Sequence, residues 1–228
     1  MTTFPQLLSG LLATDPGRPL VTFYDDSTGE RTELSVTTWA NWVAKVASLL
    51  VEELDLEGRS RLLVDVESHW LGTVVLGAAW ASGIEVVWDG EADAVVTGPS
   101  GLARWSAEAD RIPVVATALQ PLAGRFPDGV PPGVHDLGLE VWSQPDTFVA
   151  YPEPADDDAA LAGVTHAQLW VRDGAGRRVL SQTNPASASG VGALVTALAT
   201  GGSLVLVAHV SPDRLDAIAS DEKVSERV

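Results

Sequence analysis

Short apolar runs alternate with helix-like segments along most of this chain, and this alternation constrains the fold more than any other feature. Residues 62–66, 84–88 and 94–97 are mostly apolar and lack the polar alternation of a half-exposed strand. A nearly all-apolar segment at 70–81 lies between the first two runs. Strands of this kind are buried on both faces, as in parallel sheets covered by helices. We therefore expect a three-layer α/β fold with a mostly parallel sheet, or two such sheets, flanked by helices.

The ends of the chain carry more familiar patterns. Leucines at 7, 8, 11 and 12 have helical spacing, and residues 20–24 and 31–34 flank a turn-rich tip typical of a β-hairpin. Ser35 or Thr37 is placed to cap a long helix, and Ser211 begins another. The predicted order after residue 158 is a helix from about Thr165, a strand at 178–181, a helix at 190–199 and a strand at 203–208.

The length of 228 residues fits a single domain spanning 1–228. Residues 119–158 are rich in Pro, Gly and Asp and have weak periodicity, so we expect a loop-rich connection there, where two subdomains would meet. Apolar residues make up 46% of the chain and charged residues 20%, which is typical of a folded globular protein.

Charge and cysteine content exclude several function classes. The 14 basic and 31 acidic residues give a net charge of −17, which opposes binding to nucleic acid or to an anionic membrane. The absence of cysteine excludes a disulfide scaffold, a thiolate zinc site and a cysteine nucleophile. The amino terminus has no secretory pattern, and the uncharged stretch after residue 179 is broken at 200–203, so we expect a cytoplasmic protein without a membrane span.

Several motifs, in order, resemble one enzyme superfamily. The chain has Asp-Pro-Gly-Arg-Pro-Leu-Val at 15–21, Gly-Glu-Arg-Thr-Glu-Leu-Ser at 29–35, Asp-Ala-Val-Val-Thr at 93–97 and Val-Thr-His-Ala-Gln-Leu at 164–169. These segments resemble the N-terminal half of adenylate-forming enzymes, the superfamily of acyl-CoA synthetases, peptide-synthetase adenylation domains and luciferases. The resemblance implies the α/β fold of their N-terminal subdomains.

The resemblance also implies a phosphate loop directly before Gly163, and this loop is missing. Such a loop needs glycines, so that its amides reach phosphates, and a lysine to offset their charge. Residues 153–162 contain no Ser, Thr, Gly or Lys, but they contain three adjacent aspartates at 156–158. The chain also stops before the adenine-binding segment and the C-terminal lysine domain of the superfamily, and neither Lys45 nor Lys223 lies at a matching position. We therefore expect no ATP cofactor and no catalytic residue.

The candidate ligand-binding residues are few: Thr165, His166, Ser187, Ser189 and Gly190. The resemblance places His166 at the border of the active site, and free amides at a helix start near Gly190 could bind an anion. The simpler interpretation, which we favour, is that His166 is a solvent-facing residue at a helix start and that a serine caps the following helix. The four histidines lack zinc-site spacing and the aspartates lack a calcium-loop pattern, so we predict no metal site.

Eight tryptophans outnumber the other aromatic residues. Those at 39, 70 and 80 fall on apolar faces and are expected in the core. Those at 88, 105, 142 and 170 are candidates for a pocket or an interface.

Three functional hypotheses follow. The first is a non-catalytic relative of the superfamily that binds a small molecule or a protein partner. The second is a partial acyl-CoA synthetase-like enzyme completed in trans by a second chain. The edge left by the missing half is also where a protein partner or a homo-oligomer contact is expected. The third is an unrelated acid–base enzyme that uses His166, Asp65 or Glu67 in the remaining cleft.

Overall fold

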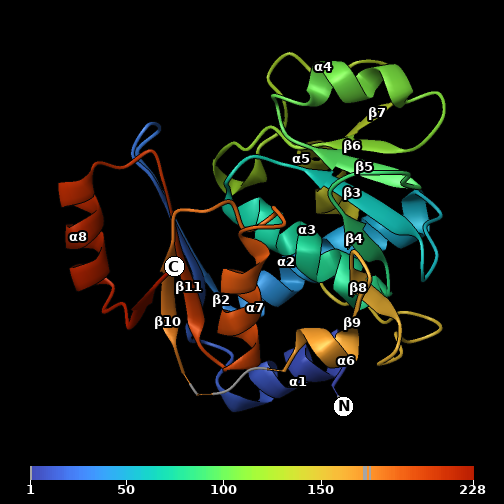
Figure 1. The fold of residues 1–228 in the computed structure, drawn as a ribbon. Helices are drawn as coiled ribbons and strands as arrows, with labels where there is room; N and C mark the ends of the chain where they lie inside the picture. The colour runs from blue at the N-terminus through green and yellow to red at the C-terminus, as the bar shows by residue number, and fades with distance from the viewer. Residues whose placement is uncertain (1, 172–173, 175) are drawn as a thin grey trace.

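The computed structural model describes residues 2–171, 174 and 176–228, and the strands among them form two sheets (Figure 1). The five-stranded sheet consists of β1 (Pro19–Asp25), β2 (Glu30–Ser35), β10 (Arg178–Ser181), β11 (Ser203–Ala208) and β12 (Glu226–Arg227), in the order β12-β10-β11-β1-β2. The seven-stranded sheet consists of β3 (Arg61–Asp65), β4 (Glu85–Val87), β5 (Ala94–Thr97), β6 (Val114–Ala116), β7 (Val134–Asp136), β8 (Ala159–Leu161) and β9 (Val164–Thr165), in the order β7-β6-β5-β3-β4-β8-β9.

Neighbouring strands are parallel except in two hairpins, β1–β2 and β8–β9. The α-helices of the described residues are α1 (Phe4–Thr14), α2 (Val36–Ser48), α3 (Trp70–Ser82), α4 (Leu102–Trp105), α5 (Leu137–Glu140), α6 (His166–Leu169), α7 (Val191–Ala199) and α8 (Pro212–Asp221). The prediction of an α/β fold with mostly parallel sheets flanked by helices is confirmed.

The core is built around α3, which is buried along its whole length. Figure 1 shows α2 and α3 side by side at the centre of the molecule, between the two sheets. A helix that is apolar on all sides needs such a position, since it has no face suited to water. Trp39, Trp70 and Trp80 are buried as predicted, and Trp39 Nε1 donates to Thr73 Oγ1 at 3.0 Å, which satisfies its polar atom.

The connection at 119–158 contains short elements that the sequence pattern did not indicate: β7, α5 and two single-turn 3-10 helices at Pro121–Ala123 and Val141–Ser143. Asp136 caps α5 by accepting a hydrogen bond from the Gly138 amide at 3.0 Å. The connection joins β6 to β8, and both of these strands belong to the seven-stranded sheet. The chain passes from one sheet to the other elsewhere, between β2 and β3 and again between β9 and β10.

The remaining tryptophans divide into buried and exposed residues. Trp105 and Trp170 are buried and Trp88 is half-buried, whereas the Trp142 residue is 58% exposed. Trp142 packs edge-on against Trp42, with ring centroids 5.4 Å apart.

No helix formed by the described residues has the length and apolar character needed to span a bilayer.

Candidate functional site

The carboxyl ends of strands from both sheets meet at one edge, which is where open α/β sheets bind ligands. Asn184, which follows β10, donates from Nδ2 to the Val66 carbonyl after β3 at 2.6 Å. Trp88, which follows β4, donates from Nε1 to the Ala186 carbonyl at 2.6 Å. We call this region the seam and define it as residues 25–30, 66–69, 184–190 and 209.

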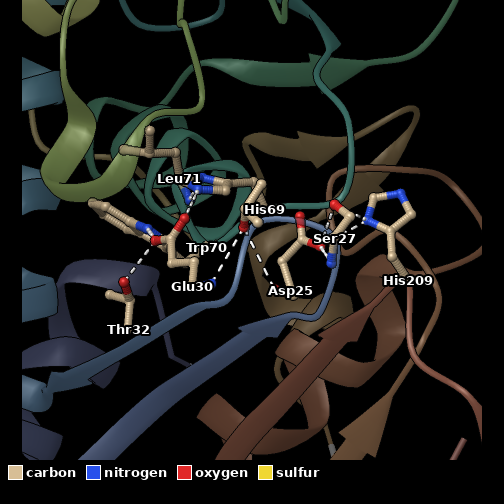
Figure 2. A network of polar contacts seen from close by, with 9 residues as sticks. Asp25, Ser27, Glu30, Thr32, His69, Trp70, Leu71 and His209 are labelled. Carbon is tan, nitrogen blue, oxygen red and sulfur yellow. Dashed lines mark hydrogen bonds and ion pairs between the residues drawn. The ribbon is translucent and has the colours of Figure 1, made fainter.

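A buried histidine and a buried glutamate lie at the centre of the seam (Figure 2). His69 is the N-cap of α3, and its Nδ1 accepts a hydrogen bond from the Leu71 amide at 3.2 Å. Its Nε2 lies 3.5 Å from Glu30 Oε2, and both side chains are almost completely buried. Because Nδ1 is an acceptor, the proton of the neutral ring is on Nε2 and faces the carboxylate.

The Glu30 carboxylate is held by three groups from two segments, strand β2 and the start of α3. Its Oε1 accepts hydrogen bonds from Thr32 Oγ1 at 2.7 Å and from Trp70 Nε1 at 3.1 Å. Burial by itself would raise the pKa of Glu30, but the contacts with His69, Thr32 and Trp70 together hold it below its usual range. The pair therefore ties the β1–β2 hairpin to the start of α3 through an ionised buried carboxylate.

A second histidine–carboxylate contact lies at the exposed end of the seam. Asp25 Oδ1 is 2.9 Å from His209 Nδ1 and accepts from Ser27 Oγ at 2.7 Å (Figure 2). Burial would raise the pKa of Asp25, but hydrogen bonds from Ser27 and His209 lower it overall. Ser27 and Asp25 both contact the same ring nitrogen, whereas a catalytic triad needs the serine on the opposite nitrogen. These residues therefore form a turn-stabilising cluster.

The loop between β10 and α7 contains three of the predicted site residues. Ser187 Oγ accepts from the Gly190 amide at 3.2 Å, and Ser189 Oγ lies 3.2 Å from Ser187 Oγ. A Cβ on Gly190 would lie 2.0 Å from the Asn184 carbonyl oxygen, so this tight turn requires glycine. Ser189 and Gly190 line a cavity of about 300 Å³ beside Ser181, Thr183 and Thr196.

Thr165 and His166 are not among the residues that line this cavity. Thr165 instead caps the single turn of α6, where its Oγ1 accepts from the Gln168 amide at 3.4 Å. The expectation that His166 faces solvent is wrong, because its side chain is completely buried against Trp170, whose Nε1 lies 3.4 Å from His166 Nδ1. Burial lowers the pKa of His166, although the nearby Asp158 charge opposes this shift.

Sequence reasoning did not identify the Glu30–His69 pair. The only local signal was a histidine directly before an all-apolar helix, which is an N-cap pattern. The loop between β3 and α3, which ends at His69, contains three buried side-chain atoms without a hydrogen-bond partner among the described residues: Glu67 Oε2, Ser68 Oγ and His69 Nε2. Of the residues named for an acid–base enzyme, Asp65 accepts from Trp105 Nε1 at 2.7 Å and Glu67 accepts from the Ser100 amide at 2.7 Å.

The described residues contain no group of three or more acidic, cysteine or histidine side chains placed to hold a metal ion. The seam contains Asp25, Asp26, Glu30 and Glu67 but no lysine or arginine. The residues of the seam are therefore anionic overall, with two imidazoles as their other ionisable groups, and Arg214, from outside the seam, lies 3.6 Å from Asp26.

The segment before Val164 is a tight hairpin. Leu161 pairs with Val164, so Ala162 and Gly163 alone connect β8 to β9. The Gly163 amide donates to Glu85 Oε1 at 2.9 Å, and the Ala162 amide donates to the Val86 carbonyl at 2.9 Å. Both amides of the turn are thus already engaged by the edge of β4. The three aspartates precede β8, at the opposite end of the strand from this turn.

No protein-family model matches the chain. A TIGR03089 family protein of Mycobacterium tuberculosis is 36% identical to it, over 99% of this chain and 99% of that protein. The chain belongs to the TIGR03089 family.

This TIGR03089 member also matches solved structures at the level of fold. A benzoate CoA ligase of Burkholderia xenovorans superposes with a TM-score of 0.75 at 17% identity, over 100% of this chain and 50% of the ligase.

The N-terminal domain of FACL13 from Mycobacterium tuberculosis superposes on the TIGR03089 chain with a TM-score of 0.70 at 14% identity. That match covers 100% of this chain and 62% of the solved domain. The TIGR03089 chain thus spans about half to three-fifths of the solved chains that share its fold. The predicted resemblance to the N-terminal region of adenylate-forming enzymes is confirmed at the level of the fold.

Proposed function

We propose that this TIGR03089 protein is a non-catalytic relative of acyl-CoA synthetases that keeps their N-terminal fold and does not bind the phosphates of ATP. The observation that carries the proposal is the two-residue turn between β8 and β9. In the superfamily that the sequence resembles, a glycine-rich phosphate loop stands at this point of the chain. Here the Gly163 amide donates to the Glu85 carboxylate, so a negative charge already occupies the donor that a phosphate would need.

The electrostatics of the seam support the same proposal. Among the described residues only one of its four carboxylates, Asp26, is paired with a lysine or arginine side chain, that of Arg214 at 3.6 Å, and a triphosphate would be repelled from the other three. A neutral or cationic group of a small molecule or protein partner is better suited to this edge. The buried Glu30–His69 pair would then stabilise the seam and would not take part in a reaction.

Thermal unfolding with and without MgATP tests the proposal directly. A ligand that binds only the folded state raises its stability in proportion to the logarithm of its concentration over Kd. We expect millimolar MgATP to leave the Tm unchanged within about 1 °C, whereas a full-length benzoate CoA ligase measured in parallel shows a clear rise.

Pyrophosphate exchange with a panel of carboxylic acids gives a second readout that does not depend on stability. No exchange above background is expected for this chain. A saturable rise in Tm with MgATP, or exchange that depends on a carboxylic acid, would overturn the proposal. The variant Glu85→Gln frees the Gly163 amide from a charged acceptor and is expected to remain unresponsive to ATP, because the turn stays too short to surround a phosphate.

A further inference from the structure

An apolar groove lies between α1 and the segment at residues 148–154. We call it the α1 groove, with a volume of about 650 Å³. Its floor is made of small side chains from α2 and the end of α3, and its walls are Leu8 and Leu12 of α1 and Phe148. Glu153 is the one charged residue among the described residues that line it. A groove of this composition resembles the sites into which amphipathic segments place an apolar face.

The α1 groove continues into a second hollow that is strongly acidic. This acidic cavity has a volume of about 840 Å³ and shares Phe148, Ala150, Glu153 and Pro154 with the groove. Its lining includes the carboxylates of Asp55, Glu57, Glu153 and Asp158 and one guanidinium, that of Arg59. Arg59 lies 2.9 Å from Asp158, so its charge is already paired.

The other three carboxylates of the acidic cavity have no described partner. Among the described residues, no hydrogen bond or ion pair is formed by the side chains of Asp55, Glu57 or Glu153. All three residues are exposed to solvent. The cavity therefore presents three uncompensated negative charges beside an apolar groove.

Two large exposed side chains lie where the hollows meet. Val149 is 79% exposed and lines the α1 groove, and Tyr151 is fully exposed and lines the acidic cavity. Exposed aliphatic and aromatic side chains next to a groove are typical of interaction surfaces.

We propose that the α1 groove and the acidic cavity together bind a basic amphipathic segment of a partner protein. Apolar side chains of that segment occupy the groove, and its lysines or arginines reach Asp55, Glu57 and Glu153. A second copy of this chain is a poorer occupant, because its net charge of −17 would bring like charges together. The surface lies at the amino ends of β3 and β4, and the seam lies at the carboxyl ends, so this proposal does not depend on the proposed loss of ATP binding.

The test uses the full chain and two synthetic amphipathic helical peptides, one of leucine and lysine and one of leucine and glutamate. Binding is measured by fluorescence anisotropy at low salt. We expect saturable binding of the lysine peptide only. The double variant Glu57→Gln/Glu153→Gln should weaken it by about fivefold, since each exposed charge pair contributes only modestly to affinity. Val149→Glu, which places a charge beside the groove, should weaken it by about tenfold or more.

Matched variants locate the binding on the molecule. Glu91→Gln/Asp110→Asn removes the same number of charges from exposed positions elsewhere, and Leu139→Glu places a charge at another exposed apolar residue. Both should leave the affinity within about twofold of the unmodified chain. The proposal is overturned if the lysine peptide does not bind, if the glutamate peptide binds equally well, or if the matched variants weaken binding as much as the groove variants. Circular dichroism of each variant confirms that a loss of binding is not a loss of folding.

Discussion

Nε2 of His69 lies 3.5 Å from Oε2 of Glu30, and this contact joins strand β2 of the five-stranded sheet to the N-cap of α3, 39 residues later in the chain. Oε1 of Glu30 is occupied by the donors Thr32 and Trp70. A glutamine at position 30 would keep that oxygen on its two donors, so its amide NH₂ would face the Nε2 proton of His69. Two donors would then oppose each other in a buried site.

We therefore expect Glu30→Gln to lower the free energy of unfolding by about 1–3 kcal/mol, measured by urea denaturation near neutral pH. Glu33→Gln is the control, because Glu33 lies on the same strand in an exposed ion pair with Arg31 and should change stability by less than about 1 kcal/mol. Equal effects of the two substitutions would show that the buried pair contributes nothing specific.

The penalty of Glu30→Gln should also depend on pH. The pKa of Glu30 is lowered in the folded state, so its carboxylate contributes stability that is complete above its ordinary pKa of 4.5. This contribution is lost as the pH falls through the lowered value. The difference in unfolding free energy between the two proteins should therefore shrink below about pH 4.5, and a constant difference down to pH 3 would contradict the assignment of an ionised Glu30.

His166 provides a second and separate pH dependence. Burial lowers its pKa from 6.5, so the unfolded chain takes up a proton at a higher pH than the folded chain does. Stability from this group is present above pH 6.5 and decreases as the pH falls below it, with a slope of up to about 1.4 kcal/mol per pH unit. We expect His166→Gln to flatten the profile between about pH 7 and pH 5.5. An unchanged slope in His166→Gln would refute the prediction.

The sequence was informative where one pattern decides one element. The apolar residues of 70–81 predicted a fully buried helix, and α3 has that position because no face of it can be solvated. Strand β7 was not predicted, since three residues between proline- and glycine-rich loops carry no periodicity and its pairing comes from the neighbouring β6.

The candidate site was less accessible from sequence for a physical reason. Glu30 and His69 meet only because α3 packs between the sheets, and no spacing rule links a hairpin residue to a helix cap 39 positions later. The missing phosphate loop could be recognised from composition, but the two-residue turn that replaces it depends on how β8 and β9 pair beside β4. His166 was placed in solvent because one helical turn gives too little pattern to define its buried face.

We expect the side chain of Asn184 to hold the loop at residues 184–190 of the seam in a fixed conformation. Its Nδ2 donates to the Val66 carbonyl, and its Oδ1 accepts from the Ala186 amide at 3.0 Å. Asn184→Ala removes both contacts, and Asn184→Asp removes only the donor. Hydrogen exchange of residues 184–190 should therefore increase in both variants, and more in Asn184→Ala. Increased exchange across the whole chain would instead indicate global destabilisation.

Close packing between α2 and α3 gives the last prediction. A Cβ on Gly77 would lie 2.7 Å from Val43 Cγ2 and 2.8 Å from Trp39 Cη2. Trp39 cannot move away easily, because it is buried and its Nε1 is bonded to Thr73. We expect Gly77→Ala to destabilise the fold by about 1–3 kcal/mol in urea denaturation, despite the higher helix propensity of alanine.

Gly10→Ala is the matched control, because Gly10 is also inside a helix but a Cβ there would meet nothing within 4 Å. That substitution should stabilise the protein by about 0.5–1 kcal/mol, the ordinary gain from replacing a helical glycine. The opposite signs of the two effects isolate the packing contribution, since backbone propensity acts equally in both variants. If Gly77→Ala were neutral or stabilising, the close contact between α2 and α3 at this position would be refuted.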